Sequence, residues 1–182
     1  MSGVVVRRAE RLGHVAPGPR RVATEIAGVC VVAGLALGVL WWLLAPEVTG
    51  VVVDGALAVD AAEGQKLFGR DAVFSLLTAG FGLVLAVVFG VRHWRRPVTV
   101  LVALALGGVA GSYLATLIGG VLGPSDDVSG LENSTEHAFA LRMESPAGLL
   151  VWSTVATVVL AVIALFREDR APWAVPGDPT GR

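Results

Sequence analysis

The sequence is poor in charged and reactive side chains. It contains one cysteine, one tyrosine and only one lysine, and charged residues make up 16% of its 182 residues, whereas a typical soluble domain has about 25%. The single cysteine, Cys30, excludes an intramolecular disulfide. It lies inside an apolar run, where burial disfavours the thiolate, so we expect no thiolate chemistry from it. The scarcity of charge is the property that classifies the chain.

Charged residues are missing altogether from four long stretches of the sequence. These stretches are residues 26–45, 73–91, 98–122 and 147–166. A helix of about 20 apolar residues crosses the hydrocarbon core of a bilayer, and a soluble chain of this size could not cover four such helices. The sequence therefore predicts an all-α integral membrane protein, a four-transmembrane-helix bundle with outer loops at 46–72 and 123–146.

The segments on either side of this membrane domain, residues 25–166, differ from it in composition. Residues 1–24 form a basic segment, and residues 167–182 are rich in proline and glycine, which is typical of an irregular tail. The first apolar stretch is longer than the roughly 7–15 residues of the apolar part of a cleavable signal peptide. We therefore expect it to be a retained membrane anchor.

The basic residues predict how the chain lies in the membrane, because Lys and Arg near helix ends stay on the cytoplasmic side. They gather in the N-terminal segment, in the connection between the second and third stretches, and in the tail. The residues that we expect to set the topology are Arg20, Arg21, Arg92, Arg95, Arg96 and Arg167. The other two connections carry ten carboxylates beside only Lys66, Arg70 and Arg142. We therefore predict a multi-pass plasma-membrane protein with cytoplasmic N- and C-termini and two acidic outer loops.

The first outer loop contains a hairpin signal. Two apolar runs, Val48–Val53 and Ala56–Val59, flank Asp54–Gly55, and a two-residue Asp-Gly link favours the positive φ angles of a hairpin turn. The alternating pattern of His137–Met143 is compatible with a third strand. The sequence thus predicts a small extracytoplasmic β-hairpin cap, with or without a third strand, and Asp71 as the N-cap of the second helix.

Small residues repeat at every fourth position of the apolar stretches, a spacing that lets helix backbones approach closely in lipid. The residues that we expect to pack helix against helix are Gly34, Gly38, Gly82, Gly107, Gly111 and Gly119. The stretch 98–122 carries a second small row, which consists of Gly108, Ser112, Thr116 and Gly120. We therefore place this stretch at the centre of the bundle. The glycines pack either within one chain or in the seam of a homodimer, and the sequence leaves both readings open.

No charged side chain lies within the central part of the four stretches, where such residues usually mark ion or proton pathways. Glu25, at the cytoplasmic edge of the first stretch, is expected to be solvated. Tyr113 lies midway along the third stretch. Its hydroxyl needs a hydrogen-bond partner in an apolar environment, and we expect Thr116, Ser153 or Thr157 to provide it.

The sequence indicates no metal or catalytic site. The histidines are His14, His93 and His137. Their spacing is not that of zinc ligands. Oxygen ligands for a divalent cation are conceivable at Asp126, Asp127 and Glu132, but a solvated acidic loop explains them better. We therefore expect no catalytic residue, no cofactor, no bound metal and no nucleic-acid partner.

Three segments are familiar: LWWLLAP (40–46), GRDAVFSLLTAGFGLVLAVVFGVR (69–92) and VALALGGVAGSYLATLIGGVLGP (102–124). They resemble a family of small four-span membrane proteins of unknown function from high-GC Gram-positive bacteria. The resemblance covers roughly residues 25–167. It implies a plasma-membrane location and no established activity, and it assigns no catalytic residues.

These features favour a non-enzymatic role. We expect an uncharacterised polytopic protein that acts as an accessory or scaffolding subunit of an envelope complex, with the lipid bilayer and either a membrane-protein partner or a homo-oligomer as its contacts. The alternative is a small-solute transporter or channel component. A third interpretation is a membrane enzyme that uses outer carboxylates such as Asp71 and Glu144 as acid or base.

Overall fold

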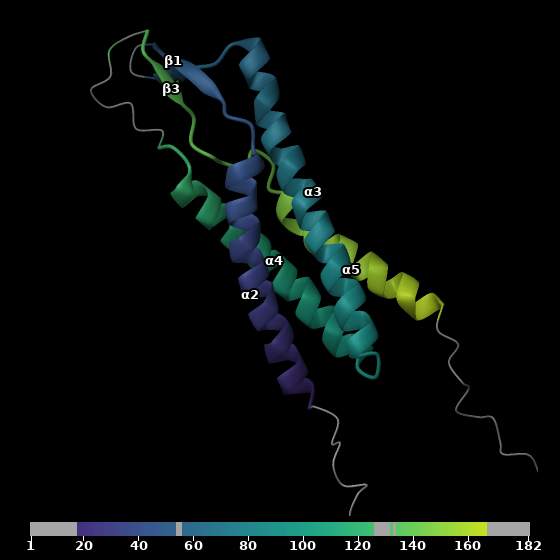
Figure 1. Cartoon of the computed structure of the whole chain (residues 1–182). Helices are drawn as coiled ribbons and strands as arrows, with labels where there is room; N and C mark the ends of the chain where they lie inside the picture. The colour runs from purple at the N-terminus through teal and green to yellow at the C-terminus, as the bar shows by residue number, and fades with distance from the viewer. Residues whose placement is uncertain (1–17, 54–55, 126–131, 133, 167–182) are drawn as a thin grey trace, which may run out of the picture.

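The computed structural model describes residues 18–53, 56–125, 132 and 134–166. The chain forms four long helices and a small sheet (Figure 1), in the order α2 (Pro19–Leu44), β1 (Thr49–Val53), β2 (Ala56–Ala58), α3 (Ala61–Arg92), α4 (Pro97–Leu122), β3 (Glu136–Ala138) and α5 (Gly148–Leu165). Successive helices run in opposite directions along the bundle. We call the end that carries the sheet the cap end, and the opposite end, where α3 turns into α4, the arginine end.

Four helices are long and apolar enough to cross a membrane. The spans within them are Pro19–Leu44, Glu63–Arg92, Pro97–Leu122 and Gly148–Leu165, with 26, 30, 26 and 18 residues. Helices α2 and α4 begin at Pro19 and Pro97, where the missing proline N–H costs nothing because the first turn has no acceptor for it. Both helices stop shortly before a proline, Pro46 or Pro124. The four predicted apolar helices are thus confirmed, and they are compatible with a multi-pass membrane protein.

Helix α3 differs from its prediction, because it begins at Ala61 rather than near residue 73. The Asp60 side chain accepts the backbone N–H of Glu63 at 2.8 Å, which makes Asp60 the N-cap of the helix. The prediction that Asp71 caps this helix is therefore wrong, since Asp71 lies inside it. Residues 61–72, the last part of the range predicted as the first outer loop, are consequently helical.

The strands form a three-stranded antiparallel sheet in the order β2-β1-β3. Val53 pairs with Ala56 and Val51 with Ala58, so the predicted hairpin is present, although its Asp54–Gly55 turn lies outside the described residues. The third strand also forms, but it covers Glu136–Ala138 rather than extending to Met143. After β3 the chain leaves the sheet and descends toward the helices.

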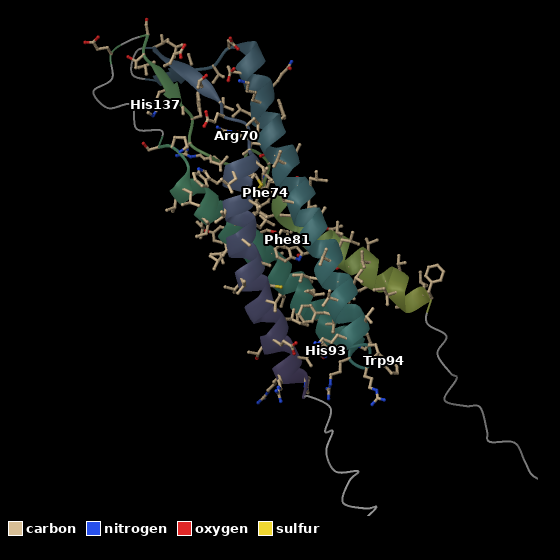
Figure 2. All side chains as sticks on the ribbon, in the orientation of Figure 1. Arg70, Phe74, Phe81, His93, Trp94 and His137 are labelled. Atoms are coloured by element: carbon tan, nitrogen blue, oxygen red, sulfur yellow. The ribbon has the colours of Figure 1, made fainter. Side chains whose placement is uncertain are left out.

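Helix α4 lies between α2 and α5, and α5 also packs on α3. The largest fully buried side chains are Trp41, Trp152 and Phe74. The Trp41 and Phe74 rings meet edge to face, with their centroids 5.0 Å apart. Aromatic rings from α2, α3 and α5 therefore fill the interior. Figure 2 shows Phe74 and Phe81 one after the other along α3.

Candidate functional site

The seam between α2 and α4 is made by backbone atoms in direct contact. A Cβ added at Gly34 would lie 2.6 Å from the carbonyl oxygen of Gly111, and one added at Gly38 would lie 2.8 Å from that of Ala115. A Cβ on Gly107 would lie 2.8 Å from the sulfur of Cys30. Any larger side chain at these positions would force the two helices apart.

The other glycines predicted to pack helices also face neighbours in the same chain. A Cβ on Gly82 would lie 2.7 Å from the Trp152 carbonyl oxygen, and one on Gly119 would lie 2.6 Å from the Trp41 ring. All six predicted glycines therefore make close contacts with other helices of the same chain. A homodimer that formed through them would have to displace these contacts.

A buried arginine holds the cap to the helices. Arg70 is 3% exposed, and its guanidinium donates to the carbonyl oxygens of Pro46 at 3.0 Å, Ala140 at 2.9 Å and Phe139 at 3.4 Å. Its own carbonyl accepts the indole N–H of Trp41 at 3.0 Å. We call these five residues the Arg70 clasp. It joins the end of α2, the first third of α3 and the chain that follows β3 (Figure 2).

Asp71, beside the clasp, binds the turn that leads into α5. Its two carboxylate oxygens accept the backbone N–H groups of Glu144 at 3.2 Å and Ser145 at 2.8 Å. The structure thus brings together the two residues considered as an acid and base pair, but Asp71 is used there as a backbone acceptor. The roles of Asp71 and Arg70 were not predicted from the sequence. The one available signal was that the charged pair Arg70–Asp71 directly precedes an apolar run.

The residues predicted to set the topology lie at the arginine end, namely Arg20, Arg21, Arg92, Arg95 and Arg96. Arg167 lies outside the described residues. Glu25 of α2 is 3.5 Å from the Nε of Arg92 and 3.6 Å from the Nε2 of His93. The expectation that Glu25 is simply solvated is therefore incomplete, because it links α2 to the end of α3.

A cleft of about 930 Å³ opens where α3, α4 and α5 meet at this end. We call it the basal cleft. The turn after α3 supplies His93, Trp94 and Arg95 to its rim, and Val100, Leu160 and Ile163 are among the residues of its apolar walls. The Arg95 guanidinium lies 5.4 Å from the centre of the Trp94 ring. Figure 1 shows the last turns of α5 pointing away from α2.

A second, almost wholly apolar groove of about 690 Å³ lies between α2 and α4 near the same end. Alanines from both helices line it, including Ala27 and Ala103, and Arg20 lies at its mouth. We call it the α2–α4 groove. It forms because the close seam between Gly34 and Gly111 does not continue to this end of the two helices.

A third groove, of about 530 Å³, runs along α4 toward the cap end and includes Tyr113, Thr116, Gly120 and Arg142. We call it the Tyr113 groove. Tyr113 is 57% exposed, and no hydrogen bond joins its hydroxyl to any residue that the structure describes. A Cβ on Gly120 would meet only the Leu141 carbonyl oxygen, at 3.7 Å. The second small row of α4 is therefore uncovered here.

The expected partners of the Tyr113 hydroxyl bond elsewhere. Thr116 donates its hydroxyl to the Tyr113 carbonyl at 2.8 Å, Ser153 donates to the Ala105 carbonyl at 2.6 Å, and Thr157 donates to the Ser153 carbonyl at 2.8 Å. The prediction of a partner among these three was wrong. Each of the three hydroxyls donates to a backbone acceptor within the helices, and none of them accepts a hydrogen bond from the phenol.

Within the described part of the chain, no three His, Cys, Asp or Glu residues gather in a way that could hold a metal ion. His137 lies 2.9 Å from the Ser125 carbonyl oxygen at the cap end, and His93 lies at the opposite end. Asp126 and Asp127 fall outside the described residues. Comparisons with protein-family models, curated proteins and solved structures found no match to this chain. Inferences about function therefore depend on the grooves, the clasp and the distribution of charge.

Proposed function

We propose that this chain is a non-enzymatic accessory or scaffolding subunit of a plasma-membrane complex, and that it holds a transmembrane helix of another membrane protein in the Tyr113 groove. The four apolar helices lie across the bilayer in this proposal. The cap end faces outward and the arginine end faces the cytoplasm.

The distribution of charge supports this orientation. The arginine end carries Arg20, Arg21, Arg92, Arg95 and Arg96. The described residues of the cap end hold the carboxylates Glu47, Asp60, Glu63, Asp71, Glu132, Glu136 and Glu144. Arginines favour the cytoplasmic side. The 26 residues of α2 span about 39 Å, which exceeds the roughly 30 Å of hydrocarbon.

Labelling with a membrane-impermeant maleimide tests the orientation. In a Cys30→Ser background, Glu132→Cys at the cap end should react in intact cells, because that end faces outward. Arg95→Cys at the arginine end should react only after the membrane is permeabilised. The opposite pattern would contradict the orientation.

The unmatched Tyr113 hydroxyl carries the partner proposal. A hydroxyl that lies in hydrocarbon without a hydrogen bond is unfavourable by roughly 1–3 kcal/mol, as mutational data indicate. Thr116 and Gly120 beside it are small, so another helix backbone can approach closely and offer an acceptor. A docked helix would therefore both satisfy the phenol and cover the open row.

The charge at the groove favours a different protein over a second copy. Arg142 borders the groove and is exposed. In a two-fold pair formed through this groove, each Arg142 would lie near the Arg142 of the other copy, and like charges in proximity are destabilising.

A photo-crosslinking residue introduced at Tyr113 tests the partner. In native membranes it should form an adduct with one distinct membrane protein, which mass spectrometry identifies. The matched control is Leu76 on α3, an exposed apolar residue outside the groove, which should not form this adduct. Tyr113→Phe keeps the ring but removes the hydroxyl, and it should lower copurification of the partner in mild detergent. Adducts with lipid alone, or with a second copy of the chain, would refute the proposal.

A solute pathway through the bundle has less support. Trp41, Phe74 and Trp152 fill the interior, and these rings would have to move to open a path. Purified protein in vesicles should therefore give no flux of small neutral solutes above that of empty vesicles. A reproducible flux without any other protein would favour the transporter alternative.

A further inference from the structure

We propose that the basal cleft binds one anionic phospholipid of the cytoplasmic leaflet, with the headgroup against Arg95 and an acyl chain against the apolar walls. This inference goes beyond the proposed function, because a lipid can occupy the basal cleft whether or not a partner helix occupies the Tyr113 groove. The two proposals have in common only the orientation of the chain in the membrane.

The lining of the cleft is polar at the arginine end and apolar farther along the helices, which matches the headgroup and the acyl chains of a phospholipid. Its polar lining comes from the turn after α3, at the arginine end. Its apolar lining includes Val100 and Leu160, which lie farther from that end along α4 and α5. A small soluble anion would leave this apolar surface uncovered, whereas an acyl chain covers it and gains about 25 cal/mol for each Å² removed from water.

The charge at the rim is complementary to a phosphate. In the described part of this end the one carboxylate is Glu25, and it lies beside Arg92 and His93. Neither Arg95 nor Arg96 forms an ion pair with any residue that the structure describes. The rim is therefore positive on the side of the turn that faces the cleft, where an anionic headgroup is attracted.

A further contact prepares the rim for a headgroup. The Trp94 ring supports the Arg95 guanidinium from one face, which leaves the in-plane N–H groups of the arginine for phosphate oxygens. The His93 side chain is 9% exposed and its Nε2 atom lies 3.6 Å from a Glu25 carboxylate oxygen, so it is not among the groups left for a headgroup.

Native mass spectrometry of the full chain in detergent micelles tests the site. The probes are phosphatidylglycerol and phosphatidylcholine with identical acyl chains. We expect one phosphatidylglycerol to be retained in preference to phosphatidylcholine. Arg95→Gln should weaken its retention about fivefold, and Arg95→Lys should restore most of it. Ala164→Phe, which places a ring in the cleft lining, should reduce retention of both lipids.

Three control variants separate the site from general attraction. Arg142→Gln removes an arginine at the cap end, and Ala161→Phe adds the same ring to α5 at a position that is also exposed. Both should leave retention unchanged. Ala27→Phe fills the α2–α4 groove and should also have no effect. Thermal unfolding verifies that each variant is folded, which we expect because Arg95 and Ala164 are exposed.

Three results would overturn the proposal. The first is equal retention of the two lipids. The second is an equal loss in Arg95→Gln and Arg142→Gln, which would indicate attraction by overall charge. The third is loss of retention in Ala27→Phe but not in Ala164→Phe, which would assign the lipid to the α2–α4 groove.

Discussion

The two ends of the bundle use arginine in opposite ways. At the cap end, Arg70 is 3% exposed and donates to three carbonyl oxygens from two other segments. At the arginine end, the Arg92 side chain is 66% exposed and lies 3.5 Å from a single carboxylate. Arg70 supplies the hydrogen bonds that regular secondary structure would otherwise supply. Its N–H groups donate to carbonyl oxygens that no strand or helix pairs. The other arginines present their charge at a surface. The same residue type thus builds the fold at one end and provides charge at the other.

The largest effect should come from removing the two arginines in turn. Arg70→Met leaves the Pro46, Phe139 and Ala140 carbonyls without their donor in a buried site, so we expect a loss of about 3–5 kcal/mol in the free energy of unfolding. Arg92→Met should cost less than about 1 kcal/mol, because an exposed ion pair contributes little. Thermal unfolding in detergent, followed by tryptophan fluorescence, measures both. Equal losses in the two variants would remove the contrast between the ends.

The next largest effect should come from the α2–α4 seam, which lies between the two ends of the bundle and depends on close contacts of glycines. Gly34→Ala puts a Cβ 2.6 Å from the Gly111 carbonyl oxygen, and such overpacking should cost about 1–3 kcal/mol. Gly28→Ala is the matched control on the same helix, because nothing lies within 4 Å of its Cβ. It should stabilise α2 by about 0.5–1 kcal/mol through helix propensity. Chemical denaturation compares the pair, and a gain in both variants would refute the tight seam.

The contact of Asp71 with the turn before α5 should have an intermediate effect at the cap end. Asp71→Ala removes the acceptor of the Glu144 and Ser145 amides, at a cost of about 1 kcal/mol. Because these bonds reach backbone N–H groups, Glu144→Ala should leave them intact. Hydrogen exchange at residues 144 and 145 should accelerate in the first variant only. Unchanged exchange in Asp71→Ala would show that the contact is not formed in solution.

The smallest effect should come from the interior between the two ends. Ser112 is fully buried and its hydroxyl has no hydrogen-bond partner among the described residues, so Ser112→Ala should leave stability unchanged or raise it slightly. Ser153→Ala, in contrast, removes the donor to the Ala105 carbonyl and should cost about 1 kcal/mol. The unfolding temperatures of the two variants make the comparison. A greater loss for Ser112→Ala would mean that its hydroxyl binds something in the folded protein.

Much of the architecture could be predicted from the sequence, because its signals are local. Uncharged stretches of about 20 residues predicted the spans within α2 and α4, although α2 begins at Pro19, seven residues before its predicted span. Asp54–Gly55 predicted the hairpin. The early start of α3 was missed, since the charged and glycine-containing segment from Ala61 reads as loop. The pairing of Asp60 with Glu63, three residues later, was the capping signal that could have located it.

The candidate sites could be predicted far less well, because they depend on distant segments. The acceptors of the Arg70 guanidinium lie 24, 69 and 70 residues away along the chain, so no local pattern identifies them. Thr116 belongs to the same small row as Ser112, yet Thr116 is half-buried and lines a groove, whereas Ser112 is fully buried. The difference arises because α5 covers only part of α4, and that depends on the tertiary packing.

Helix α3 reaches both ends without a break. Its first turn holds Glu63, which accepts the backbone N–H of Thr49 in β1 at 3.2 Å, and its last residue is Arg92, next to the rim of the basal cleft. It is some 48 Å long, and Arg70 lies in its first third, nearer the cap end. One unbroken helix thus joins the sheet at the cap end to the rim of the basal cleft at the arginine end.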